Sequence, residues 1–148
     1  MKINRIICQA TSDKQVTIPD PEGKNIVLYF YPKDSTPGCI TEGQDFRDNY
    51  QRFLNANTLI YGVSRDSIKS HENFKAKQNF PFELISDSDE KLCNMFNVIQ
   101  LKKLYGREYM GIVRSTFIID KNGNILKKWT NVKVKGHALE VLKQTEKL

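Results

Sequence analysis

Cys39 is the residue whose surroundings most clearly predict chemistry. It ends the segment Pro32-Lys-Asp-Ser-Thr-Pro-Gly-Cys39, which is rich in residues that favour turns. Thr36 followed by Pro37 is typical of a helix N-cap and a first helical position, so we expect a helix to begin beside Cys39. A free thiol is mostly protonated at neutral pH, whereas the thiolate is the nucleophile. Unpaired N–H groups and the dipole at a helix start favour the thiolate, so the sequence predicts a reactive cysteine here.

A cation near the sulfur would stabilise the thiolate further, and Arg114 is the candidate. It lies in the apolar stretch Gly111-Ile-Val-Arg-Ser-Thr-Phe117, within an expected buried strand over residues 112–120. An arginine on a buried strand is difficult to explain by packing alone. Glu42 stands one helical turn after Cys39, where the helix dipole favours a carboxylate. We expect Glu42 to support the site, for example by orienting Arg114.

The segment from Tyr29 to Cys39 resembles the active-site signature of the peroxiredoxins. The likeness is greatest to the bacterioferritin comigratory protein, or peroxiredoxin Q, subfamily, with Pro32, Thr36 and Cys39 at the matching positions. The resemblance runs from about Gly23 to the end of the chain, although the subfamily's usual Ala-Pro-Phe opening is missing. Later blocks that resemble the subfamily are Tyr105-Gly, Tyr109-Met-Gly-Ile, Arg114-Ser-Thr-Phe-Ile-Ile-Asp120, Gly136-His137 and Val141-Leu142.

The resemblance implies a thiol-dependent peroxidase that reduces hydrogen peroxide and organic hydroperoxides to water and alcohols, in antioxidant defence. Cys39 would be the peroxidatic nucleophile and would become a sulfenic acid. The Thr36 hydroxyl would hold peroxide and thiolate, Pro32 would shield the site, and Arg114 would stabilise the thiolate and the polarised O–O bond. Neither a metal nor another cofactor is expected. Thioredoxin or a similar thiol is the expected reductant, and a monomer the expected state.

Removal of the sulfenic acid is a separate question. Many members of the subfamily carry a resolving cysteine five residues after the nucleophile, where this chain has Gln44. The remaining candidates are Cys93, Cys8 and a thiol from outside the protein. Cys93 is the first choice within the chain, but a bond to Cys39 requires the two Cα atoms to come within about 7 Å. The first turn of the helix that carries Cys39 would then have to unwind.

Two other functions fit a reactive cysteine. A thiol-disulfide oxidoreductase of the same fold normally uses Cys-x-x-Cys, but Glu42 occupies the place of the second cysteine. A peroxide-sensing redox module needs the same cysteine environment as a peroxidase, and only turnover separates the two. His71 and His137 lie on separate expected helices, and the reaction needs no cysteine-histidine pair if Arg114 stabilises the thiolate.

The hydrophobic pattern predicts an α/β protein with a thioredoxin-like fold. Apolar runs predict strands, periodic stretches predict amphipathic helices, and Asn-Gly at 122–123 predicts a hairpin. The order indicates a central mixed β-sheet with helices on both faces. The expected strands are 26–31, 58–64, 82–85, 112–120 and 125–129. The expected helices begin near Cys39, Ser67 and His137, the last with Leu139 and Leu142 facing inward, and a further helix within residues 86–96 carries Cys93.

Length and composition set the outer limits. With 148 residues, of which 39% are hydrophobic, the chain can bury one substantial core, so we expect a single domain over residues 1–148. No apolar run is long enough to cross a membrane. The net charge of +6 comes from basic residues interleaved with acids, which does not favour nucleic-acid binding. Three cysteines without a secretion signal indicate reduced thiols and a cytoplasmic location.

Overall fold

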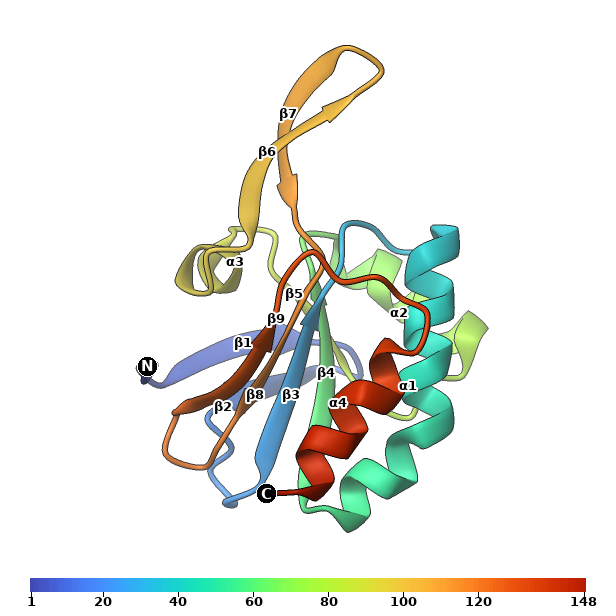
Figure 1. Cartoon of the computed structure of the whole chain (residues 1–148). Coiled ribbons are helices and arrows are strands. Elements are labelled where there is room, and N and C mark those ends of the chain that lie inside the picture. Colours follow the sequence, from blue (N-terminus) through green and yellow to red (C-terminus); the bar gives the residue numbers. More distant parts are fainter.

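A seven-stranded mixed sheet forms the centre of the computed structural model, which describes residues 1–148 (Figure 1). Its strand order is β2-β1-β5-β4-β3-β8-β9. A separate two-stranded sheet, β6-β7, projects from one end of the central sheet. The strands are β1 (Ile6–Ala10), β2 (Lys14–Ile18), β3 (Asn25–Phe30), β4 (Thr58–Ser64), β5 (Leu84–Ser86), β6 (Ile99–Leu104), β7 (Arg107–Ile112), β8 (Ser115–Ile119) and β9 (Ile125–Trp129).

The apolar run that ends at Tyr31 forms β3 in the middle of this sheet, as predicted. β3 pairs in parallel with β4, where Val27 faces Ile60, and antiparallel with β8, where Val27 faces Ile118. Five of its six residues are buried, because helices and loops cover both sides. The central strand therefore delivers the loop after Phe30 to the carboxyl end of the sheet, where the chain turns towards Cys39.

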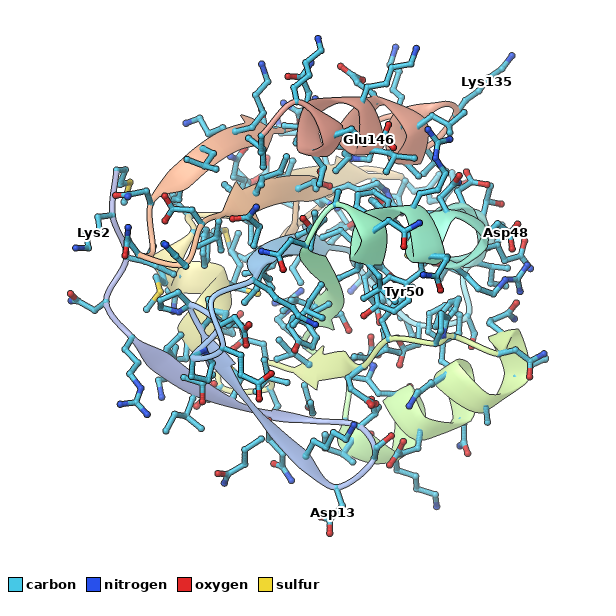
Figure 2. All side chains as sticks on the ribbon, turned by 90° about the horizontal axis from the view of Figure 1, so that it is seen from below. Lys2, Asp13, Asp48, Tyr50, Lys135 and Glu146 are labelled. Carbon is cyan, nitrogen blue, oxygen red and sulfur yellow. The ribbon has the colours of Figure 1, made fainter.

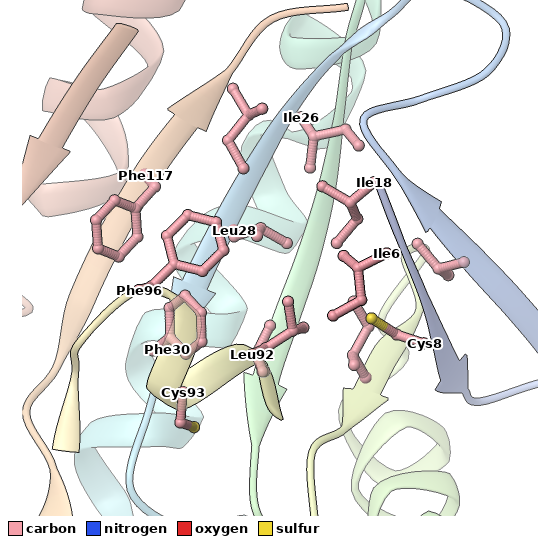
Figure 3. Close-up of a cluster of buried hydrophobic side chains, with 14 of the residues drawn as sticks. Ile6, Cys8, Ile18, Ile26, Leu28, Phe30, Leu92, Cys93, Phe96 and Phe117 are labelled. Carbon is pink, nitrogen blue, oxygen red and sulfur yellow. The ribbon is translucent and has the colours of Figure 1, made fainter. Parts of the chain in front are cut away.

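Helices cover both faces of the sheet, which confirms that prediction. The helices are α1 (Pro37–Asn55), α2 (Ile68–Gln78), α3 (Lys91–Met95) and α4 (His137–Glu146). Phe46 of α1, Phe74 of α2 and Leu142 of α4 belong to one hydrophobic cluster. The short helix α3 contributes Leu92 to a second cluster, which contains Phe30 and is shown in Figure 3. The side chains of β3 alternate between these two clusters, as the period of a strand requires.

Some expectations from the sequence were wrong. The expected strand over 112–120 is two strands, because β7 ends at Ile112 and β8 begins at Ser115. The hairpin of β6 and β7 was not predicted, since most of its residues are exposed and show no clear apolar alternation. Leu139 is 49% exposed, so it does not face inward, whereas Leu142 is buried as expected.

Charged side chains of both signs extend outward around the fold. Figure 2 shows Lys2, Asp13 and Lys135 at the outer edge of the molecule on different sides. None of the helices combines the length and the apolar character that crossing a lipid bilayer would require.

Candidate active site

Cys39 lies in the first turn of α1, as the cap signal predicted. The helix begins at Pro37, Thr36 is its N-cap, and the Ile40 N–H donates to the Thr36 carbonyl over 2.9 Å. The Cys39 side chain is almost fully enclosed, with 1% of the residue exposed. The Thr36 hydroxyl donates to the Lys33 carbonyl over 2.9 Å rather than accepting a helix N–H. Its oxygen lone pairs therefore stay available for an O–H donor near the helix start.

Arg114 contacts the sulfur of Cys39, as the sequence predicted. One guanidinium nitrogen, Nη2, lies 3.4 Å from Sγ, and the other, Nη1, donates to Glu42 Oε1 over 2.6 Å. Arg114 does not lie on a strand, which corrects the expectation from its apolar neighbours. It lies in the link between β7 and β8, and the Val132 N–H donates to its carbonyl over 3.0 Å. A residue in such a link can turn its side chain towards α1, which a central ladder position would not allow.

Gly38 allows this approach. A Cβ atom at position 38 would lie 3.2 Å from Nη2 of Arg114, which is tighter than an ordinary contact. The residue before the cysteine is thus small where the guanidinium passes over the first turn of α1. The glycine that the sequence placed in a turn also makes room for the cation.

Glu42 supports Arg114 from the same helix. Its side chain is 1% exposed, and that of Arg114 is 16% exposed. Burial raises the pKa of Glu42 to about 7, although the charge and hydrogen bond of Arg114 act in the opposite direction. Glu42 Oε2 is buried without a hydrogen-bond partner. The ionised form of Glu42 is therefore only partly stabilised by Arg114. This carboxyl group lies one helical turn from the sulfur of Cys39.

A buried network anchors the loop before Cys39. Asp34 accepts hydrogen bonds from the Tyr31 hydroxyl over 2.7 Å and from the Ser70 hydroxyl over 2.8 Å. It also meets His71 Nδ1 at 2.6 Å, while His71 Nε2 faces the Ile85 carbonyl at 2.9 Å. Both ring nitrogens thus lie within hydrogen-bond distance of oxygen atoms, one on the loop and one on β5. The loop is tied to α2 and β5 before it reaches α1.

Asp34, Asp66 and His71 are also the residues whose spacing could suit a metal ion, since their ligand atoms lie within 4.8 Å of one another. Hydrogen bonds account for this closeness. The Asp34 N–H donates to Asp66 Oδ2 over 3.0 Å, and His71 contacts the Asp34 carboxylate directly. The cluster is therefore explained as a structural anchor.

We expect His71→Asn to destabilise the fold by about 3 kcal/mol, because the buried Asp34 carboxylate loses its contact with the imidazole and keeps only the hydroxyls of Tyr31 and Ser70. The side chains of His71 and Asp34 are 0% and 3% exposed. Urea unfolding at pH 7 measures this loss. The matched control is His137→Asn, since burial lowers the pKa of His137 to about 4 and its one side-chain partner, Thr116, is neutral. Equal losses in the two variants would contradict a special contribution of the Asp34–His71 contact, and Asp34→Asn combined with His71→Asn should recover part of the loss.

The other predicted residues occupy different places. Pro32 follows β3 at the start of the anchored loop and is half-buried. Cys93 lies in α3 and Cys8 in β1, and Figure 3 shows both in the cluster around Leu92. Cys39 belongs to the cluster on the opposite face of the sheet. The structure thus brings together Cys39, Arg114 and Glu42, and leaves Cys93 and Cys8 apart from them.

The thiols of Cys8 and Cys93 are both disfavoured as thiolates. Burial raises the pKa of Cys8 to about 12, with a further contribution from the negative charge of Asp87. Burial also raises the pKa of Cys93 well above its usual value, and a hydrogen bond to Asp87 adds to the effect. Neither thiol is therefore a ready nucleophile in the folded protein.

Comparison with known proteins identifies the family. The model of the AhpC/TSA family matches residues 2–128. The chain belongs to this family. Peroxiredoxin Bcp of Bacillus subtilis is 54% identical over 127 residues, which cover 86% of this chain and 81% of that protein. Peroxiredoxin Bcp of Xanthomonas campestris is 53% identical over 128 residues, covering 86% and 80%.

Solved structures of peroxiredoxins agree with this assignment. The bacterioferritin comigratory protein of Xanthomonas campestris, described for its alkyl peroxide reduction activity, has a TM-score of 0.91 and 47% identity. The alignment covers 96% of this chain and 90% of that one. A cysteine mutant of PrxQ from Xylella fastidiosa has a TM-score of 0.94 and 43% identity, covering 99% and 94%. The thioredoxin-like fold, the Bcp/PrxQ subfamily and a thiol peroxidase function, all expected from the signature, are confirmed.

The sequence did not reveal the anchor of the peroxiredoxin loop. Asp34 lies within the signature itself, but its buried partner His71 is 37 residues away and was considered only as a base. His71 and Phe74 lie three residues apart on α2, and both are buried. A histidine on the apolar side of a helix is a signal for a buried polar partner, because its ring nitrogens need hydrogen bonds there.

Proposed function

We propose that this peroxiredoxin reduces hydrogen peroxide and alkyl hydroperoxides at Cys39. The observation that carries the proposal is the 3.4 Å contact between Arg114 Nη2 and Cys39 Sγ in the first turn of α1. A guanidinium donor and a helix start together favour the thiolate, which is the form that attacks a peroxide oxygen. The alkyl peroxide reduction described for the Xanthomonas campestris relative supports this substrate class.

The residues of the loop have distinct roles in this proposal. The Cys39 thiolate attacks the nearer peroxide oxygen, the O–O bond breaks, and sulfur becomes a sulfenic acid while water or an alcohol leaves. Thr36 accepts a hydrogen bond from the peroxide O–H and so fixes its direction, and Pro32 limits the access of water. Arg114 also stabilises the negative charge that develops on the leaving oxygen. The anchor at Asp34 holds this loop in place before substrate binds.

We propose an external thiol, with thioredoxin as the first choice, as the reductant of the sulfenic acid. Cys93 packs on the other face of the sheet from Cys39 and is fully buried. Formation of a disulfide between them would require α1 or α3 to open, since the two Cα atoms must come within about 7 Å. Cys93 is thus a resolving residue only in an opened form of the protein.

A coupled assay tests the function. The protein, with thioredoxin, its reductase and NADPH, should consume hydrogen peroxide and cumene hydroperoxide continuously. A peroxide-sensing module would react once and stop, and a thiol-disulfide oxidoreductase would reduce a disulfide substrate without any peroxide. Absence of turnover with both peroxides would overturn the proposal.

Replacing Cys93 by Ser should leave the first turnover with peroxide unchanged within about twofold, because the Cys93 thiol lies outside the site and a Ser hydroxyl can still donate to Asp87. Stopped-flow tryptophan fluorescence gives this rate, and peptide mass spectrometry gives the state of Cys39 afterwards. Cys8→Ser is the control. A Cys39–Cys93 disulfide in most of the wild-type protein after one equivalent of peroxide would show that α3 opens during the cycle.

The chain is further proposed to act as a monomeric single domain in the cytoplasm. Seven strands share one sheet over the length of the chain, which supports one domain. The three cysteines are free and buried, as expected in a reducing compartment. Sedimentation at several protein concentrations tests the oligomeric state, and a dimer mass at micromolar concentration would contradict it.

A further inference from the structure

Arg114 is a single cation shared by two acids. It contacts Cys39 Sγ at 3.4 Å through one nitrogen and Glu42 Oε1 at 2.6 Å through another. Cys39 and Glu42 come from the same helix, one turn apart, and each is about 1% exposed. If both were ionised, the three groups would carry a net charge of −1 in a buried place, which is unfavourable. With one proton between the two acids, the group is neutral.

The second oxygen of Glu42 shows where that proton would reside. Oε2 is buried and has no hydrogen-bond partner, so it receives none of the donors that would stabilise a carboxylate. The groups that face Glu42 are Arg114 from the β7–β8 link, Tyr29 from β3, and Cys39 and Asp45 from α1. Of these, only Arg114 is a cation.

Tyr29 makes no hydrogen bond to Glu42 in this structure. Its hydroxyl is buried and also lacks a partner, and burial raises the pKa of Tyr29 well above its usual value. Asp45 adds negative charge and raises the pKa of Glu42 further. Burial remains the larger cause and brings the pKa of Glu42 to about 7, within the working range of a cytoplasmic enzyme.

Lys102 of β6 is a second positive charge near the site. Partial burial lowers its pKa, and the nearby charges of Arg114 and Arg65 lower it further. Lys102 is partly exposed, and the salt bridge of Glu42 is made with Arg114 rather than with Lys102. It therefore contributes to the field at the mouth of the site without pairing with the buried acid.

We propose that Glu42 is a positioning residue that exchanges protonation with Cys39 through their shared partner Arg114. While the sulfur is a thiolate, Glu42 holds the proton, and when the sulfur becomes a neutral sulfenic acid, Glu42 becomes a carboxylate. This assignment rests on the proposed function of Cys39 as the peroxidatic residue. It extends the role expected for Glu42 from orienting Arg114 to keeping the total charge of Cys39, Glu42 and Arg114 neutral.

The steps balance. In the resting enzyme, the Cys39 thiol and the Glu42 carboxylate become the thiolate and the carboxylic acid, and no charge enters or leaves. In the peroxide step, the S–O bond forms and the O–O bond breaks, so sulfur is oxidised and the peroxide reduced. Thiolate, hydroperoxide and the Glu42 acid give sulfenic acid, alcohol and the Glu42 carboxylate. The proton that Glu42 releases balances the one taken up by the leaving alkoxide.

Isotope-edited infrared spectroscopy of protein labelled with ¹³C-carboxyl glutamate tests the exchange without turnover. The reduced protein at pH 7 should show a protonated carboxyl band that is missing from Glu42→Gln. The band should disappear when methyl methanethiosulfonate caps Cys39 as a neutral disulfide. Arg114 then has Glu42 as its one negatively charged partner, and Glu42 ionises. A Glu42 band that persists after capping, or that is missing in the reduced protein, would overturn the proposal.

The pH profile of the first peroxide turnover gives a second readout, which a purely structural role of Glu42 would not move. In Glu42→Gln no second acid competes for Arg114, so the acidic limb of the profile should move to lower pH by about one unit. Asp48→Asn is the matched control, since it removes an exposed carboxylate of α1 that pairs with Arg47 rather than Arg114, and its profile should stay within about 0.3 unit of wild type. An unchanged profile in Glu42→Gln would contradict the exchange. If the wild-type protein does not react with peroxide at any pH, the result would instead contradict the proposed function.

Discussion

Cys39→Ser should lose peroxidase activity by at least about a thousandfold, because a serine hydroxyl is a far weaker nucleophile than the sulfur it replaces. The change replaces one buried atom at the start of α1 and keeps the volume nearly constant, so the fold should persist. Steady-state consumption of cumene hydroperoxide with thioredoxin and its reductase measures the loss. Circular dichroism and urea unfolding show whether the variant is folded.

Two controls make this result specific to the sulfur at position 39. Cys8→Ser and Cys93→Ser each remove a buried thiol whose pKa is raised, and both should keep the first turnover. A double Cys8→Ser, Cys93→Ser variant retains Cys39 as its only thiol and should react with one equivalent of peroxide. Turnover in folded Cys39→Ser would refute the proposed nucleophile.

Arg114→Gln should lower the rate of the first peroxide step by about a hundredfold or more, since it removes the donor to both the sulfur and the leaving oxygen. It should also lower the free energy of unfolding by about 3 kcal/mol at pH 9, where the wild-type Glu42 carboxylate is ionised and paired with the cation that the variant lacks. The two losses have separate origins. Stopped-flow fluorescence reports the first and urea unfolding the second.

The pH dependence of the Arg114→Gln stability follows from the folded and unfolded states of Glu42. Its pKa is already raised to about 7 in the fold, against an ordinary value of 4.5, and loss of Arg114 raises it further. Above pH 4.5 the unfolded chain releases this proton while the folded protein keeps it, so stability falls as pH rises. The difference from wild type should be larger at pH 8 than at pH 5.

A double-variant cycle separates charge from catalysis. Arg114→Gln combined with Glu42→Gln removes both members of the buried pair, and stability should return to within about 1 kcal/mol of wild type. Activity should stay low, because the donor to the peroxide is still missing. Recovery of activity in the double variant would show that Arg114 acts only by neutralising Glu42.

Much of the site was predictable because its signals are local. Thr36, Pro37 and Gly38 mark a helix start, and the residues around Cys39 carry the family signature within a few positions. The central strands were predicted for a similar reason, since β3 and β4 are buried on both faces and read as unbroken apolar runs. Arg114 was identified as exceptional because a charge among apolar residues needs a partner.

Features that depend on long-range contacts were not predictable. The exposed hairpin of β6 and β7 has no core-facing pattern, so periodicity gave no signal for it. The link at Arg114 is recognised only when the two strands around it join different sheets. The pairing of Asp34 with His71 requires α2 to pack beside the loop after β3, which a single sequence does not show. The separation of Cys93 from Cys39 likewise follows from the two faces of the sheet.

The Asp34 anchor has a consequence for how oxidised enzyme meets its reductant. Because Asp34 is bound to His71, Ser70 and Tyr31, the chain on the amino-terminal side of Cys39 is fixed to the body. Phe46, fully buried, fixes α1 two turns further on. If a protein thiol reduces the oxidised sulfur, as proposed, we expect its access to come from fraying of the short span between these two points. Because only the segment between Asp34 and Phe46 would open, the free energy needed to expose the sulfur stays small, and the central sheet would keep its structure.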